Sequence, residues 1–160
     1  MNYIALEDYK KAWIFRHQEL PISEDDKAQI KPMSATRSTQ LWKERISKQS
    51  DHPDFFKKGD WAFEIETWQE QGEWESIFDS ADTALPELIL ESIEWQDNTV
   101  VYYCCDQNNV IESNWGVFKR CWKNFLFMDD GVLLIAKKRN EVVQFLSNGS
   151  FQIGKINQQN

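Results

Sequence analysis

The sequence lacks basic residues over more than a third of its length. No Lys, Arg or His lies between Lys58 and Lys119. Residues 59–118 therefore carry a net charge of −14, against −8 for the whole chain. Their fourteen carboxylates are Asp60, Glu64, Glu66, Glu70, Glu73, Glu75, Asp79, Asp82, Glu87, Glu91, Glu94, Asp97, Asp106 and Glu112. Charge distributed so unevenly is informative about partners and association rather than about fold.

Cysteine is also scarce, with three residues in 160. Cys104 and Cys105 are adjacent, and neighbours in a strand point to opposite faces, so a disulfide between them would strain the backbone. No CxxC pair occurs, and the two His lie far away in the sequence, so a zinc site is not expected. We expect buried thiols in a reducing compartment.

Long apolar runs are absent too. The longest, Gly131–Ala136, is far shorter than the roughly 20 residues of a membrane-spanning helix. The N-terminal residues carry charges where a signal peptide would have its apolar core. We therefore expect a cytoplasmic protein with no membrane partner. Eight Trp and 14% aromatic residues distinguish it from disordered acidic chains.

The last third of the chain has the clearest local signals. Residues 99–105 are apolar on both faces and predict a central strand. Ser113 is the expected cap of an amphipathic helix that contains Trp115, Phe118, Trp122 and Phe125. Three strands separated by turns should follow, namely Val132–Ala136, Val142–Leu146 and Phe151–Ile156.

The earlier segments are less regular. Their alternating or β-branched stretches predict strands at 12–17 and 61–66, and their turn residues predict loops at 49–60 and 69–72. Helices are expected from Ser23 to before Pro32, over about 34–48, and over 73–79; residues 86–95 fit either a helix or a strand. The tail, Asn157–Asn160, should be frayed.

Together these elements predict a single α+β domain over 1–160. Its mostly antiparallel sheet should include a C-terminal β-meander, with helices packed on one face. A mixed-charge N-terminal segment, residues 1–58, precedes the acidic middle, residues 59–118. Residues 113–156 then supply the amphipathic helix and the meander.

The best candidate site is a partner-binding surface within the acidic middle. Two indoles lie there among carboxylates, a combination that suits Lys or Arg side chains of a basic protein. The residues are Glu66, Trp68, Glu70, Glu73 and Trp74. Alternatively, both indoles turn inward and the acidity serves solubility. The working surface would then lie elsewhere, for example on the helix at 115–125.

Enzymatic signatures are missing: the chain has no GxSxG, P-loop or GxGxxG motif. The alternative hypothesis is a small metal-assisted hydrolase that uses clustered carboxylates and His17, although no EF-hand spacing is present. We assign no catalytic residue, metal ligand or cofactor. An acidic chain also lacks the basic footprint of nucleic-acid binders, so direct nucleic-acid binding is not expected.

Three segments resemble a family of uncharacterised bacterial proteins: Asp8–His17, Ser113–Phe127 and Asp129–Gly131. The resemblance extends over most of the chain. It implies a bacterial cytoplasmic protein and brings no activity, cofactor or site residue. In its acidity and Trp content the chain is also similar to bacterial immunity proteins, which neutralise basic toxins.

Overall fold

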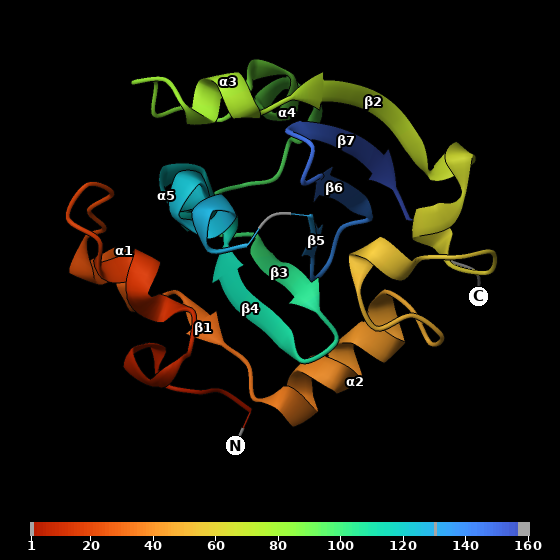
Figure 1. The fold of residues 1–160 in the computed structure, drawn as a ribbon, viewed down its shortest axis with the longest axis horizontal. Helices are drawn as coiled ribbons and strands as arrows, with labels where there is room; N and C mark the ends of the chain where they lie inside the picture. The colour runs from red at the N-terminus through yellow and green to blue at the C-terminus, as the bar shows by residue number, and fades with distance from the viewer. Residues whose placement is uncertain (1, 130, 157–160) are drawn as a thin grey trace.

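A seven-stranded antiparallel sheet lies at the centre of the computed structural model, which describes residues 2–129 and 131–156. The strand order is β1-β4-β3-β5-β6-β7-β2 (Figure 1). The strands are β1 (Lys31–Pro32), β2 (Trp68–Glu73), β3 (Val100–Asp106), β4 (Asn109–Asn114), β5 (Val132–Ala136), β6 (Glu141–Phe145) and β7 (Ser150–Lys155). The predicted antiparallel sheet and the C-terminal meander β5–β7 are confirmed, and β3 lies inside the sheet as expected.

Helical segments complete an α+β fold, which confirms the predicted class. The α-helices are α1 (Glu24–Lys27), α2 (Ala35–Arg45), α3 (Glu75–Phe78), α4 (Glu87–Ser92) and α5 (Trp115–Met128). The 3₁₀-helices are η1 (Leu6–Asp8), η2 (Ala12–Arg16), η3 (Pro53–Phe55), η4 (Trp61–Phe63) and η5 (Ile65–Thr67). The ambiguous segment 86–95 is helical at α4.

Helices cover both faces of the sheet rather than one. Along β3, Tyr103 and Cys105 belong to the core beneath α5, whereas Tyr102 and Cys104 belong to a second core beneath α2. A strand that is apolar on both faces needs a cover on each side, because otherwise one apolar row would face water. The expectation of a single covered face therefore changes to two.

Two predicted strands are instead 3₁₀-helical. Residues 12–16 form η2, and Asn124 in α5 donates to the carbonyl of Ile14. Residues 61–67 form η4 and η5, closed by hydrogen bonds from the side chains of Thr67 and Trp68 back to the carbonyls of Trp61 and Ala62. Neither segment pairs with a strand in the described fold, so the local pattern has no partner edge.

The predicted turn at 69–72 is also wrong, since these residues belong to β2, in which residues 70–72 pair with β7. Gly72 permits this pairing. A Cβ on Gly72 would lie 2.3 Å from the Cζ atom of Phe151, whose ring is buried. The glycine that indicated a turn is there because of close packing.

Helix starts agree better with the sequence. Ser23 caps α1 and Ser34 caps α2, and each side chain accepts a backbone hydrogen bond. The cap of α5 is Asn114 rather than Ser113, because residues 109–114 form the unpredicted strand β4. The expected fraying of Asn157–Asn160 falls outside the described residues.

Candidate functional site: an acidic edge of the sheet

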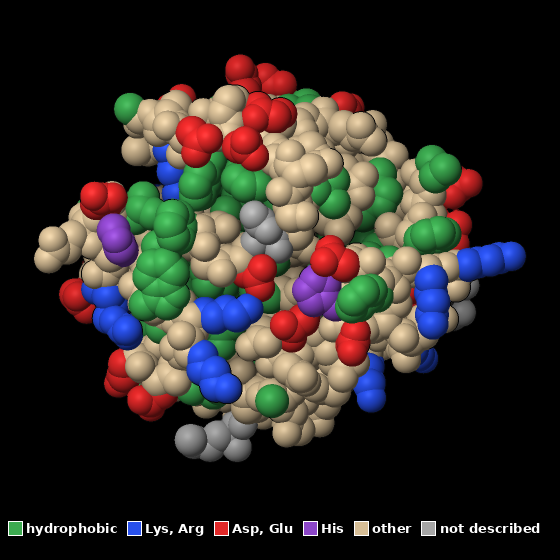
Figure 2. All heavy atoms as spheres, in the orientation of Figure 1, with side chains coloured by type: hydrophobic (Ala, Val, Ile, Leu, Met, Phe, Trp, Pro, Cys, Tyr) green, Lys and Arg blue, Asp and Glu red, His purple; other side chains and the backbone are tan. Residues whose placement is uncertain are grey.

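Most carboxylates of residues 59–118 lie on the surface. Figure 2 shows acidic side chains gathered along the top of the molecule, over α3, α4 and β2 as labelled in Figure 1. The exposed members are Glu64, Glu66, Glu70, Glu73, Glu75, Asp79, Asp82, Glu87, Glu91, Glu94 and Asp97. Only Asp60 is buried, while Asp106 and Glu112 are half-buried. The negative charge is therefore presented to solvent.

Few cations of the protein itself pair with these carboxylates. Among the described residues, Asp97 is the one carboxylate of 59–118 that forms an ion pair, with Lys119 Nζ at 2.7 Å. The hydrogen bond from Lys119 lowers the pKa of Asp97. The exposed carboxylates of residues 64–94 have no ion-pair partner among the described residues, so their field extends into solvent.

The three predicted carboxylates differ in how they are held. Glu66 and Glu70 are exposed and make no hydrogen bond or ion pair within the described part of the chain. Glu73 accepts hydrogen bonds from the backbone N and the hydroxyl of Ser76, at 2.7 and 2.6 Å. These bonds lower the pKa of Glu73 and connect it to the first turn of α3.

The two predicted indoles turn inward. Trp74 is 5% exposed and donates to the carbonyl of Leu146 at 3.1 Å. Trp68 is half-buried and donates to the carbonyl of Ala62 at 3.0 Å. They pack into opposite cores, because a register shift at Gln69 reverses the faces of β2. The carboxylates are thus available to a partner, and the indoles anchor the strand.

Two exposed apolar residues were missed. Phe63 is 54% and Ile65 86% exposed, and they alternate with Glu64 and Glu66 immediately before β2. A half-buried strand at 61–66 would have placed Phe63 and Ile65 opposite Glu64 and Glu66, on the buried face, so the local pattern did not indicate their exposure. The segments η4 and η5 replace that strand. We call residues 63–73 the acidic edge, a surface that combines carboxylates with apolar side chains.

The residues of the hydrolase hypothesis do not converge. His17 is exposed, its Nδ1 accepts from the backbone N of Glu19 at 3.2 Å, and its ring lies against Trp13. Within residues 2–129 and 131–156, no three His, Cys, Asp or Glu side chains are grouped so that they could hold a metal ion. The structure supplies no observation that favours this alternative.

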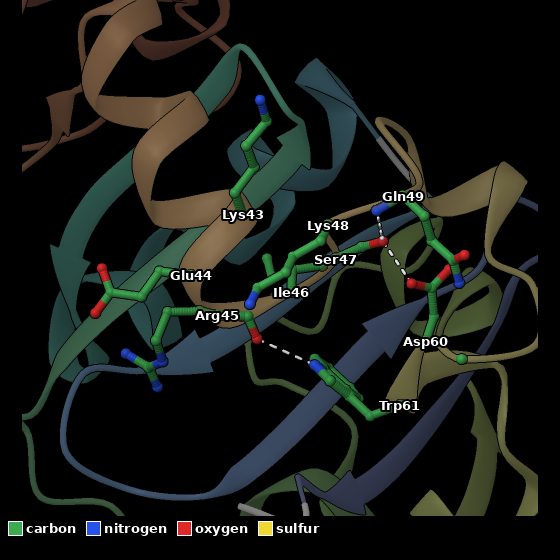
Figure 3. Close-up of a pocket in the computed structure, with 10 residues that line it drawn as sticks. Lys43, Glu44, Arg45, Ile46, Ser47, Lys48, Gln49, Asp60 and Trp61 are labelled. Carbon is green, nitrogen blue, oxygen red and sulfur yellow. Dashed lines mark hydrogen bonds between the residues drawn. The ribbon is translucent and has the colours of Figure 1, made fainter. Parts of the chain in front are cut away.

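The buried carboxylate, Asp60, lies beside a surface depression at the C-terminal end of α2 (Figure 3). It accepts hydrogen bonds from the Ser47 hydroxyl at 2.5 Å, the Ser50 hydroxyl at 2.8 Å and the backbone N of Lys57 at 3.0 Å. Burial raises the pKa of Asp60, but these hydrogen bonds outweigh it and the pKa is lowered. This network holds the loop 47–60 together.

The apolar residues of the helix at 115–125, proposed as an alternative working surface, are not accessible. Trp115, Phe118, Trp122 and Phe125 of α5 are all buried in the core. Their spacing reflects packing against the sheet rather than binding. The acidic edge therefore remains the best candidate site.

A family model covers almost the whole of the described fold, matching residues 3–154. The chain belongs to the family described as "Protein of unknown function (DUF2947)". This confirms the expected membership of an uncharacterised family. Comparison with curated proteins and with solved structures gave no match. Among the described residues, no helix has the length and apolar character needed to cross a membrane.

Proposed function

We propose that this protein is a non-enzymatic cytoplasmic binding protein whose acidic edge engages a basic protein. The observation that carries the proposal is the set of exposed carboxylates without internal cations. Only Asp97 of the fourteen is ion-paired among the described residues. Such a surface attracts a cationic partner from solution and increases its association rate.

Several carboxylates must act together, because a single exposed ion pair contributes only about 0–1 kcal/mol. Glu66, Glu70 and Glu73 follow one another along one short segment, so a partner that lies along this segment can contact all three. Phe63 and Ile65 add apolar area that charge alone does not supply. The binding should therefore be strongly salt-dependent and should retain a component that salt does not remove.

The test is affinity capture from native lysate at low salt, followed by salt-step elution and mass spectrometry. The bait is either the wild-type protein or the variant Glu66→Gln, Glu70→Gln, Glu73→Gln. Glutamine keeps an oxygen that can accept from Ser76, so the start of α3 is preserved. The matched control is Glu7→Gln, Glu19→Gln, Glu44→Gln, three exposed residues outside the acidic middle.

The proposal predicts one basic protein that wild type and control retain and that the acidic-edge variant loses at a defined salt step. If the acidic-edge variant retained every salt-sensitive partner, the proposed function would be wrong. Equal loss from both variants would show that net charge matters and the acidic edge does not, which also contradicts it.

A further inference from the structure

We infer that the outer edge of β2 is the place where the basic partner binds, as an extended segment that adds a strand to the sheet. The inference rests on the proposed function and makes it more specific. Strand addition uses main-chain hydrogen bonds for affinity and side-chain contacts for selection.

The outer edge of β2 has no neighbour in the described fold. Strand β2 ends the sheet order and pairs only with β7 (Figure 1). The backbone N of Trp74 donates to Gly149, so residues 74 and 72 face β7. In an antiparallel pair the intervening residues point the other way. The backbone groups of Gln71 and Glu73 therefore face solvent.

The opposite edge of the sheet is protected. Strand β1 consists of Lys31 and Pro32 only, and its outer side is covered by the N-terminal segment, since the backbone N of Ile4 donates to the carbonyl of Pro32. Short strands and proline are common devices that block pairing with another chain. Strand β2 is six residues long and contains no proline. Its edge is left open where the other is closed.

Charge identifies the occupant as cationic. Glu70 lies on the face of Gly72 and Trp74, and Glu73 lies on the opposite face, so carboxylates flank the edge on both sides. A second copy of this chain would place carboxylates against carboxylates, and like charges across strands destabilise pairing. An extended segment with Lys or Arg on both faces gains opposite-charge pairs instead.

The first test uses the wild-type protein and two fluorescent peptides of equal charge. One is an octapeptide of the repeat Lys-Lys-Val-Val, which places Lys on both faces of an extended strand, and the other is the same peptide with alternate backbone nitrogens methylated. Removing the donors of one peptide edge should weaken binding about tenfold or more, since several main-chain hydrogen bonds are lost. Hydrogen exchange should show new protection at the Gln71 and Glu73 amides with the unmodified peptide.

The second test compares Gln71→Pro with Gln71→Ala. Proline removes the outward N–H without removing a bond to β7, whereas alanine keeps it. We expect only the proline variant to lose the unmodified peptide, with thermal unfolding confirming that both fold. Equal binding of both peptides to the wild type, or no new amide protection, would overturn the inference. Lysate capture with the acidic-edge variant would still test the proposed function independently of this inference.

Discussion

At the scale of single residues, the same side chain has different roles in the acidic middle according to its surroundings. Asp60 is 3% exposed and bonded by two hydroxyls and a backbone N–H, so its charge holds a loop. Glu66 and Glu70 are exposed and have no partner within the described residues. Composition counts these carboxylates alike, and only their contacts separate the structural one from those available for binding.

The variant Asp60→Asn should show the structural role as a pH dependence. The folded-state pKa of Asp60 lies below the ordinary aspartate value of about 3.9, so its ionised form adds stability above that pH. This stability is lost as the pH falls through the folded-state pKa. At pH 7 we expect the variant to be about 1–3 kcal/mol less stable in urea unfolding.

That difference should shrink as the pH falls below about 4, because the wild-type carboxylate then becomes protonated. The control is Asp25→Asn, the same substitution at an exposed residue. A stability difference for Asp60→Asn that stayed constant from pH 7 to pH 3 would contradict the assigned role.

At the scale of elements, the start of α5 shows how the predicted helix cap differs from the observed cap. Ser113 and Asn114 are both capping residues, and the helical spacing that follows does not choose between them. In the structure the Asn114 side chain accepts from the backbone N of Val117 at 2.9 Å. The buried Ser113 hydroxyl has no hydrogen-bond partner among the described residues.

We therefore expect Asn114→Ala to destabilise the protein by about 1 kcal/mol, because the cap of a core helix is lost. Asn114→Asp should retain much of this stability, since its carboxylate can accept the same bond and favours the helix N-terminus. Ser113→Ala should cost little, because the hydroxyl it removes is unsatisfied. Thermal unfolding of the three variants decides between the two caps; a larger loss for Ser113→Ala would contradict the structure.

Elements that depend on residues close together in the sequence were predicted better than elements that depend on a distant partner strand. Helix α2 was predicted from its apolar stripe and strand β3 from its apolar run, signals that neighbours in sequence supply. The meander was predicted from its turns. Residues 61–66 have an equally clear alternation and form 3₁₀-helices, because a strand also needs a partner edge. Strand β2 was missed for the converse reason, since β7 pairs with a segment whose own pattern indicates a turn.

At the scale of the whole molecule, one edge of the sheet is closed and the other is open. Its two edges differ, with a short proline-containing strand at β1 and an open six-residue strand at β2. The uncompensated carboxylates gather over α3 and β2, next to the open edge. Mutual repulsion among them is a cost to folding that a bound basic partner would relieve.

This repulsion predicts that salt stabilises the unbound protein. Raising NaCl from about 10 mM to about 150 mM shortens the Debye length from about 30 Å to about 8 Å. We expect Tm to rise by about 2–4 °C, which corresponds to roughly 1 kcal/mol for a chain of this size.

The rise in Tm should be smaller in the variant Glu66→Gln, Glu70→Gln, Glu73→Gln than in the matched variant at Glu7, Glu19 and Glu44. The reason is that only the first set lies in the region of unbalanced charge. Differential scanning calorimetry at the two salt concentrations measures this. Identical salt dependence in both variants would mean that the acidic edge does not repel itself.

The sequence by itself determined the charge asymmetry, the cap of α1 and the turns of the meander, because each depends on residues close together in the chain. Only the tertiary structure decided that Trp68 and Trp74 turn inward, that Phe63 and Ile65 face solvent, and that the edge of β2 is open. These features depend on which segment lies beside which. Pairing of β2 with β7 joins residues far apart in the chain, and no local pattern encodes that choice.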